Sequence, residues 1–326
     1  MRFVDLDIDY NNISYKATRD GSGEGLLVLG AENPNIVVIG ADISGSVRTD
    51  WFRDRYPDRY ISLGIAEQNH IGVAAGLSLS GKIPYVVNFS MFLSGRAWDQ
   101  IRTTVCYSNL NVKLIGAHGG ISVGPDGATH QPLEEIAIMR CLPNMRVIVP
   151  MDYNEAKKAV ISVAASHNPV YIRFGREPFA SLTKEETPFE IGKAYAIREG
   201  TDVAIIACGS MVYESLLAAQ TLAKEGISAM VINNHTIKPL DQETIINAAK
   251  LTSAIVTAEE HQIAGGMGSA VVECLSQNYP VPVKMIGIDD KFGESGSFED
   301  LKELFGVNNK YIAEAARQVI AMKKSL

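Results

Sequence analysis

The stretch Gly64-Ile65-Ala66-Glu67-Gln68-Asn69-His70 directly follows a short apolar run, and the same arrangement recurs twice downstream. The two later motifs are the segments 88–92 (NFSMF) and 116–131 (GAHGGISVGPDGATHQ). The runs that precede the three motifs are 60–63, 83–87 and 112–115, and they are rich in the β-branched residues typical of strands. Between the motifs, residues 71–79 and 97–107 have a helical pattern. This alternation predicts a parallel sheet with helices on its faces.

Polar and aromatic side chains gather just past the predicted strands. In an open parallel sheet, ligands bind outside the carboxyl ends of the strands, so these side chains should share one edge. The three motifs place six such residues at this edge: Glu67, Phe89, Phe92, His118, Asp126 and His130. An apolar run at 36–40 adds Asp42 and Ser46, and a strand at 170–174 adds Arg176. The sequence therefore predicts one functional edge on the first sheet.

The chain of 326 residues is long enough for two domains, because single hydrophobic cores rarely grow beyond about 250–300 residues. A polar, irregular stretch at 179–189 is the expected linker between a first domain, 1–178, and a second domain, 190–326. In the second domain the expected strands are 203–207, 228–232, 254–257 and 283–286, and the expected helices are 211–225, 242–250, 268–277 and 312–322. The predicted fold class is α/β, with two three-layer α/β/α domains.

The composition argues against several classes of protein. With 46% hydrophobic and 21% charged residues, the chain can fill sizeable cores. A formal charge of −7 and the lack of a Lys/Arg cluster argue against a nucleic-acid partner. The four cysteines form no C-x-x-C pair, which argues against a zinc site or a disulfide framework. The acidic N-terminus, and the absence of a run of roughly 18 apolar residues, predict a cytoplasmic protein without a membrane partner.

Two common nucleotide-binding motifs are missing from the predicted edge. No G-x-G-x-x-G lies between a strand and a helix, because the glycines at 21–25 precede the first strand. The glycines at 265–268 are better explained by a closely packed helix start than by a phosphate site. No Walker loop occurs. The edge therefore has acids, histidines and aromatic rings without a diphosphate or metal site of its own, which indicates half of a shared site.

The motifs resemble those of the C-terminal half of transketolase, a thiamine diphosphate enzyme. The resemblance rests on the three motifs, in family order and spacing, together with the segments 16–19, 95–102, 142–145 and 259–261. It covers the chain from about residue 15 to the end, and it implies a pyrimidine-binding domain followed by a transketolase C-terminal domain. The family's amino-terminal domain, which binds the diphosphate and magnesium, is missing. The chain thus resembles the second subunit of a split, two-gene transketolase.

The resemblance implies cofactor contacts for four residues. Glu67 matches the glutamate that hydrogen-bonds the pyrimidine ring and promotes proton removal from the thiazolium. Phe89 and Phe92 match the aromatic residues that pack on the pyrimidine, and which of the two stacks on it stays open. Asp42 matches a contact on the thiazolium side. Gly95 stands where many one-chain transketolases carry a tyrosine. Without the resemblance, Glu67 would be read as a helix-capping residue and the two phenylalanines as core.

The resemblance also implies sugar contacts in the glycine-rich loop. His118 and His130 match residues that handle protons on the hydroxyl and carbonyl oxygens of the substrate, and a pKa near 6.5 suits such a role for histidine. Asp126 matches the residue that binds a substrate hydroxyl group. A satisfied structural role is the plainer interpretation of one histidine alone, but two histidines in one loop favour function.

Phosphate contacts are implied for Arg19, Ser46 and Arg176. Guanidinium groups bind a dianionic phosphate through charge-assisted hydrogen bonds, and a hydroxyl group can add another. Arg173 is an alternative to Arg176 because both lie at the end of the same predicted strand. A surface ion pair is the plainer interpretation of each arginine taken alone.

The implied activity is transfer of a two-carbon ketol unit between a ketose phosphate and an aldose phosphate. Thiamine diphosphate would lie between this chain and a partner that carries the diphosphate and the Mg²⁺ (or Ca²⁺), in an α2β2 assembly, so the chain alone is expected to be inactive. Three alternatives stay open: the β subunit of a 2-oxoacid dehydrogenase E1, a deoxyxylulose-phosphate-synthase-like enzyme, and a catalytically silent scaffold. The loop from Asp126 to His130 argues against the first. No chemistry is assigned to Glu259, Glu260 and His261, and the ketose is not identified.

Overall fold

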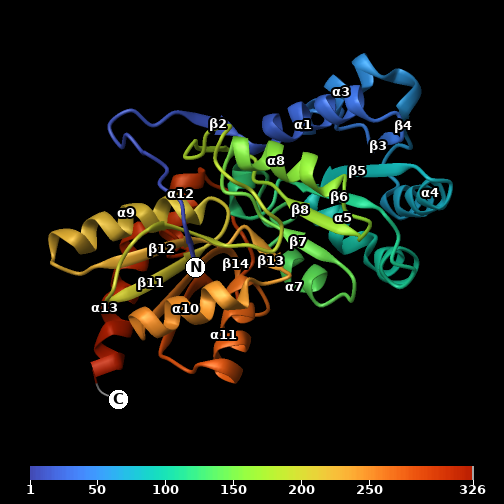
Figure 1. Ribbon diagram of the computed structural model, residues 1–326. Helices are drawn as coiled ribbons and strands as arrows, with labels where there is room; N and C mark the ends of the chain where they lie inside the picture. The colour runs from blue at the N-terminus through green and yellow to red at the C-terminus, as the bar shows by residue number, and fades with distance from the viewer. Residues whose placement is uncertain (325–326) are drawn as a thin grey trace.

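The computed structural model describes residues 1–324 as two α/β lobes, each built on its own sheet (Figure 1). The first sheet has seven strands in the order β13-β7-β8-β6-β5-β3-β4. Its strands are β3 (Ile36–Gly40), β4 (Tyr60–Ser62), β5 (Ile83–Phe89), β6 (Lys113–Ala117), β7 (Arg146–Ile148), β8 (Val170–Arg173) and β13 (Thr236–Lys238). All neighbours run parallel except β13, which is antiparallel to β7. The prediction of a parallel sheet is confirmed.

Helices cover both faces of the first sheet. One face carries α1 (Thr18–Glu32), α3 (Thr49–Arg55) and α8 (Tyr153–Val163), and the other carries α4 (Glu67–Leu79), α5 (Ser90–Arg96) and α7 (Glu135–Arg140). Successive strand residues point to opposite faces, so Val38 packs with the α1 and α8 layer while Ile39 packs with α4 and α5. This burial on both sides explains why the strands are continuously apolar.

The glycine-rich start of α1 is explained by close helix packing. A Cβ atom at Gly21 would collide with the backbone carbonyl of Tyr153 in α8, and one at Gly25 would lie 3.0 Å from the side chain of Val160. At the other glycine cluster, a Cβ atom at Gly266 would collide with the carboxylate of Glu259. Both clusters serve packing and helix starts, because only glycine allows such approach. The sequence predicts this role for the second cluster only.

The second sheet has six strands in the order β1-β10-β12-β11-β14-β15. They are β1 (Arg2–Phe3), β10 (Tyr195–Arg198), β11 (Val203–Ala207), β12 (Ala229–Asn233), β14 (Ile255–Gln262) and β15 (Val283–Ile288). One face of this sheet carries α9 (Met211–Lys224) and α13 (Asn309–Lys324). The other face carries α10 (Gln242–Thr252) and α11 (Met267–Asn278). The short helix α12 (Phe298–Leu304) lies near the first lobe. The predicted elements are present with slightly shifted ends. The antiparallel β10 and the short β1 were not predicted.

Each sheet takes a strand from the other half of the sequence. β1, at the very N-terminus, pairs with β10 of the second sheet, and Figure 1 shows the chain starting beside that lobe. Conversely, β13 follows β12 in sequence but pairs with β7 of the first sheet. A two-stranded ribbon joins β2 (Tyr15–Ala17) to β9 (Pro178–Ala180), at the start of the expected linker. The two lobes are therefore interlocked through their edge strands.

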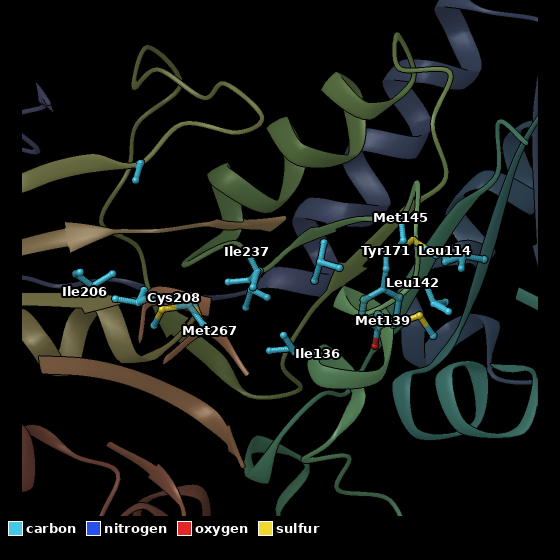
Figure 2. Packing of buried hydrophobic residues seen from close by; sticks show 14 of the residues in the cluster. Leu114, Ile136, Met139, Leu142, Met145, Tyr171, Ile206, Cys208, Ile237 and Met267 are labelled. Carbon is cyan, nitrogen blue, oxygen red and sulfur yellow. The ribbon is translucent and has the colours of Figure 1, made fainter. Parts of the chain in front are cut away.

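A shared hydrophobic cluster also joins the lobes (Figure 2). Ile136 of α7 and Ile237 of β13 lie between Tyr171 of the first sheet on one side and Ile206 and Met267 of the second lobe on the other. All five side chains are buried. Because interiors pack tightly, this cluster fixes the second lobe against the loops at the edge of the first sheet.

Three predicted helices have different bounds. The α4 helix begins at Glu67, four residues earlier than predicted, so Glu67 lies in its first turn. The predicted helix 97–107 consists of a short α6 (Trp98–Gln100) and a π-helical stretch, η2 (Ile101–Cys106). The sequence also predicts a helix over 133–141, ending before Pro143, and the structure forms only the shorter α7 there. Over residues 1–324, the structure contains no helix with the length and apolar character that crossing a membrane requires.

Candidate active site

The order of the strands in the first sheet gathers the candidate residues along its carboxyl edge. Arg176 follows β8, the loop from His118 follows β6, and Phe89 ends β5. Ser46, in the short helix α2 (Ser44–Val47), follows β3, and Glu67 follows β4 at the outer end of the sheet. Because these five strands lie next to one another in the sheet, in the order β8-β6-β5-β3-β4, residues from distant segments of the chain meet along one edge.

Glu67 is a buried acid with a single cationic partner. Its side chain is 1% exposed, and its Oε2 accepts a hydrogen bond of 2.8 Å from Nη1 of Arg96. The guanidinium of Arg96 also lies over the ring of Phe92, with its Cζ 4.7 Å from the ring centre. Arg96 was not a candidate from the sequence, although it follows Phe92 by four residues, a spacing that puts two helical side chains on one face. Arg96 thus connects the acid to the aromatic part of the site.

Four rings form a wall beside Glu67 and Arg96, which we call the ring wall: Phe89, Phe92, His118 and His130. The rings of Phe89 and His118 are stacked, with centres 4.6 Å apart and planes inclined by 24°. The ring of Phe92 meets His130 edge-on, with centres 5.2 Å apart. Phe89 lies 6.4 Å from both Phe92 and His130. The two phenylalanines and the two histidines predicted from separate motifs are therefore one cluster.

A cluster of cationic side chains, Arg19, Arg48 and Arg176, adjoins the ring wall. Nη1 of Arg19 donates a hydrogen bond of 3.2 Å to the backbone carbonyl of Ser46 and lies 3.5 Å from Nε2 of His118. Nε of Arg19 is buried and has no hydrogen-bond partner among residues 1–324. Burial lowers the pKa of Arg19, and the nearby charges of Arg48 and Arg176 lower it further. A buried guanidinium donor among like charges is a site that an anion would satisfy.

His118 has an unusual environment for a histidine. Its backbone has a left-handed φ of 59°, which turns the chain at the start of the loop. Burial lowers the pKa of His118 to about 3, with further lowering by Arg19 and Arg176. The ring is therefore neutral around pH 7, unlike the histidine of near-neutral pKa that the sequence suggests. A neutral imidazole can donate a hydrogen bond from one nitrogen and accept one at the other.

We expect the imidazole resonances of His118 to stay constant from pH 8 to pH 5 in the isolated chain. The reason is that desolvation and three neighbouring arginines oppose protonation. The measurement is a pH titration of histidine side-chain NMR signals, with the His118→Asn variant used to assign the missing peak. A His118 signal that titrates between pH 6 and 7 would contradict this environment.

The remaining candidates occupy the outer part of the edge. Asp126 and Arg176 form a loose ion pair of 3.7 Å, and Arg176 donates a hydrogen bond of 2.6 Å to the carbonyl of Val123. Arg173 is 3% exposed and binds Glu135 at 2.8 Å, so it points into the interior and is not a substitute for Arg176. Asp42 is exposed after β3, and in the described part of the chain no hydrogen bond or ion pair joins it to the other candidates.

The site is an open edge rather than an enclosed cavity. A cavity of about 620 Å³ lies at the carboxyl ends of β14 and β15, lined by residues such as Gln262, Asp289 and Phe292, but none of the candidates lines it. The buried acid, the rings and the cations converge instead at the edge of the first sheet. Among residues 1–324 no group of three or more His, Cys, Asp or Glu side chains is arranged to hold a metal ion.

Comparisons with known proteins identify the two domains of the chain. Residues 14–180 match the pyrimidine-binding domain of transketolase, and residues 192–312 match the transketolase C-terminal domain. A Methanocaldococcus jannaschii protein, provisionally named a transketolase C-terminal section, is 45% identical over 95% of this chain and 98% of its own length. The 6-deoxy-6-sulfo-D-fructose transketolase subunit SqwH of Clostridium sp. (strain MSTE9) is 43% identical over 94% of this chain and 95% of its own length.

A solved structure is similar over nearly the whole chain. It is described as a split-gene transketolase, inactive beta4 tetramer, and it is 44% identical with a TM-score of 0.89. The match covers 94% of this chain and 99% of the other. Together with the two domain matches, these relatives show that the chain belongs to the transketolase family, among the chains that carry its pyrimidine-binding and C-terminal domains.

Proposed function

We propose that this chain is the C-terminal subunit of a thiamine-diphosphate-dependent transketolase, which transfers a two-carbon ketol unit from a ketose phosphate to an aldose phosphate. One observation carries the proposal: the buried acid Glu67, the ring wall and the cationic cluster around Arg19 follow one another along a single edge. This order provides an acid for a heterocycle, a surface for its ring, hydrogen-bonding groups for a sugar, and cations for a terminal phosphate.

The residues present fit the pyrimidine part of the cofactor. Glu67 is buried yet accepts a hydrogen bond only from the half-exposed Arg96 in the described structure, so its carboxyl group can engage a ring nitrogen. Phe92 and Phe89 would hold the ring and fix its tilt, at a gain of roughly 0.5–1.5 kcal/mol per aromatic pair. When bound, thiamine diphosphate supplies the carbon nucleophile of the reaction. The role of Glu67 is to hold a proton at the pyrimidine nitrogen.

The other residues act on the sugar. Neutral His118 would donate and accept hydrogen bonds at the substrate's oxygens, together with His130, whose ring also contacts Phe89. Asp126 would bind a hydroxyl group. Arg19 and Arg176 would bind the phosphate through charge-assisted hydrogen bonds. The name of the Clostridium relative refers to a sulfonated ketose. A sulfonate is also an anion, so a panel of donors is needed to identify the preferred ketose.

The α4 helix leaves an apolar face uncovered next to Glu67. Gly72 and Gly76 are exposed in mid-helix, and a Cβ atom at either position would meet nothing within 4 Å. The flanking Ile65 and Leu79 are 69% and 77% exposed. Exposed apolar groups beside a site mark contact with another chain, and glycine allows a backbone to approach closely. We propose that an N-terminal partner subunit packs on this face. That subunit would carry the diphosphate and Mg²⁺ site, in an α2β2 assembly.

Replacing Gly72 with leucine should separate folding from assembly. The isolated variant should be as stable as the wild type or more stable by about 0.5–1 kcal/mol, because glycine is unfavourable in mid-helix and the new side chain has free space. Association with the partner should weaken by at least about tenfold, because the side chain occupies the contact face. Urea unfolding and analytical ultracentrifugation measure the two effects. Gly81→Leu, at an exposed glycine in the turn after α4, is a control for added apolar surface, although its positive φ costs some stability.

Reconstitution tests the proposed function. The purified chain with thiamine diphosphate and Mg²⁺ should be inactive, and addition of an N-terminal transketolase subunit should restore ketol transfer from a ketose phosphate. Full activity without a partner would refute the split-subunit proposal. Decarboxylation of a 2-oxoacid by the complex, without ketol transfer, would favour the 2-oxoacid dehydrogenase or deoxyxylulose-phosphate-synthase alternatives instead.

A further inference from the structure

The segment 118–131, which we call the substrate loop, contains little regular structure to hold its shape. Its backbone adopts a positive φ at His118, Gly120, Gly124 and Gly127. Its helical structure is a kinked 3₁₀ stretch, η3 (Ile121–Asp126), with Gly124 at the kink. A loop with this conformation depends on contacts from outside for its position. The contacts that position the loop bear on the proposed function, and a role for them rests on the proposed roles of His118, Asp126 and His130.

Glu260 of the second lobe reaches into the substrate loop. It lies in β14 and is 2% exposed. Its Oε1 accepts a hydrogen bond of 2.7 Å from the backbone N–H of Ser122, and its Oε2 accepts one of 2.8 Å from Oγ of Ser210. A Cβ atom at Gly120 would collide with Oε1 of Glu260, so the glycine allows the carboxylate to reach the backbone. The contact joins residues 138 positions apart in sequence.

Arg173 of the first lobe contacts both Glu260 and the glycines of the loop. Its Nη2 donates a hydrogen bond of 2.8 Å to the backbone carbonyl of Glu260, and its Nε binds Glu135 at 2.8 Å. A Cβ atom at Gly119 would collide with the guanidinium. The glycine pair of the loop therefore lies between a guanidinium of the first lobe and a carboxylate of the second. Both groups are buried: the guanidinium is paired with Glu135, and the carboxylate accepts hydrogen bonds from Ser122 and Ser210. Pairing and hydrogen bonding are the conditions under which buried charges are tolerated.

The far end of the substrate loop is also tied to the second lobe. Nε2 of Gln131 donates hydrogen bonds to the carbonyl of Gly124, at 3.0 Å, and to the carbonyl of Glu294, at 2.9 Å. The N–H of Gln262 donates to the carbonyl of Leu133, just beyond the loop, at 2.8 Å. Contacts from the second lobe thus hold both ends of a loop that belongs to the first.

We infer that Glu260 is a positioning residue, through which the second lobe holds the substrate loop in the shape that presents His118 and Asp126 to the sugar. Its carboxylate contacts Ser122 and Ser210, so the action proposed for it is indirect. It acts through the N–H of Ser122. The Oγ of Ser122 in turn donates a hydrogen bond to the carbonyl of Gly119 and accepts one from the N–H of Arg176. The second lobe is then part of the sugar site, although every sugar-binding residue lies in the first.

Hydrogen exchange on the full chain tests this inference without any substrate. In Glu260→Ala, amide exchange over residues 118–127 should be roughly 10- to 100-fold faster than in the wild type, because a buried charge-assisted hydrogen bond is lost. Glu259→Ala is the matched control, since Glu259 is the adjacent buried carboxylate but binds the N–H groups of Met267 and Gly268. That control should speed exchange at 265–270 and leave the substrate loop unchanged.

Two conservative variants keep the test decisive if Glu260→Ala folds poorly. Glu260→Asp keeps the charge but withdraws it from Ser122 by one methylene, so it should also loosen the loop. Glu260→Gln retains an acceptor for the N–H of Ser122 and should restore most of the protection. Unchanged exchange over 118–127 in the folded Glu260→Asp and Glu260→Ala proteins would overturn the inference.

Kinetics of the reconstituted complex give a second readout. Glu260→Ala should raise KM for the ketose phosphate about tenfold or more while the Kd for thiamine diphosphate stays within twofold. An equal loss of cofactor binding would indicate a general structural defect and would also count against the inference. A wild-type complex without ketol transfer would count against the proposed function alone, because the exchange result requires no turnover.

Discussion

Replacing Glu67 with glutamine should lower kcat of the reconstituted complex by about 10²–10⁴-fold, the usual contribution of general acid–base catalysis. The amide cannot hold and release a proton at the pyrimidine nitrogen as a carboxyl group can. The isosteric change keeps a polar group beside Arg96, so the local fold should persist. Steady-state ketol transfer measures the effect, and the Kd for thiamine diphosphate should change far less than kcat.

Glu214→Gln provides a matched control for Glu67→Gln. Glu214 is also a buried carboxylate in the first turn of a helix with one cationic partner, Lys302 at 2.5 Å, but it lies in the second lobe. Its replacement should reduce stability without reducing kcat of the folded complex. Unchanged turnover in Glu67→Gln would refute the assigned role and revive the silent-scaffold alternative.

Removal of the phosphate-binding cations is expected to have the second large effect. Arg19→Ala and Arg176→Ala should each raise KM for a ketose phosphate by roughly 10- to 100-fold, because a hydrogen bond to a charged group contributes about 1.5–3 kcal/mol. The buried, unpartnered Nε of Arg19 supports a bound anion at this place. Initial rates over a range of ketose phosphate concentrations give KM and kcat separately.

The unphosphorylated ketose distinguishes phosphate binding from a general defect. If the arginines bind the phosphate, their removal should reduce the preference for the phosphorylated donor and leave kcat/KM for the free ketose nearly unchanged. Arg59→Ala is the control, because Arg59 binds carbonyls of Asn33 and Gly30 at the amino end of β4, on the opposite edge of the sheet. Equal losses with both donors would contradict the assignment.

The sequence predicts the carboxyl edge of the first sheet because its signals are local. Short β-branched runs specify the strands, and the rule for parallel sheets then places Glu67, Phe89 and His118 on one edge. The structure brings these residues together through a chain of contacts that includes Arg19 and Phe92. Their chemical roles stay proposals that the variants above test.

The features that the sequence did not predict depend on long-range packing. β1 and β13 have two and three residues, too few for a periodic pattern, and their partners are far away in sequence. The low pKa of His118 arises from burial, and from the charges of arginines that other segments supply. The contact between Glu260 and the N–H of Ser122 depends on the approach of two lobes, which no local motif reports.

The exchange of edge strands between the lobes has a consequence for anyone who dissects the gene. An expression product that ends near residue 185 would lack β13 and leave β7 as an unpaired edge, while one that begins there would lack β1 beside β10. Unpaired backbone N–H and C=O groups at such edges recruit other chains. Half-length products should therefore tend to aggregate, and soluble material should require both halves to be made together, either as one polypeptide or by co-expression.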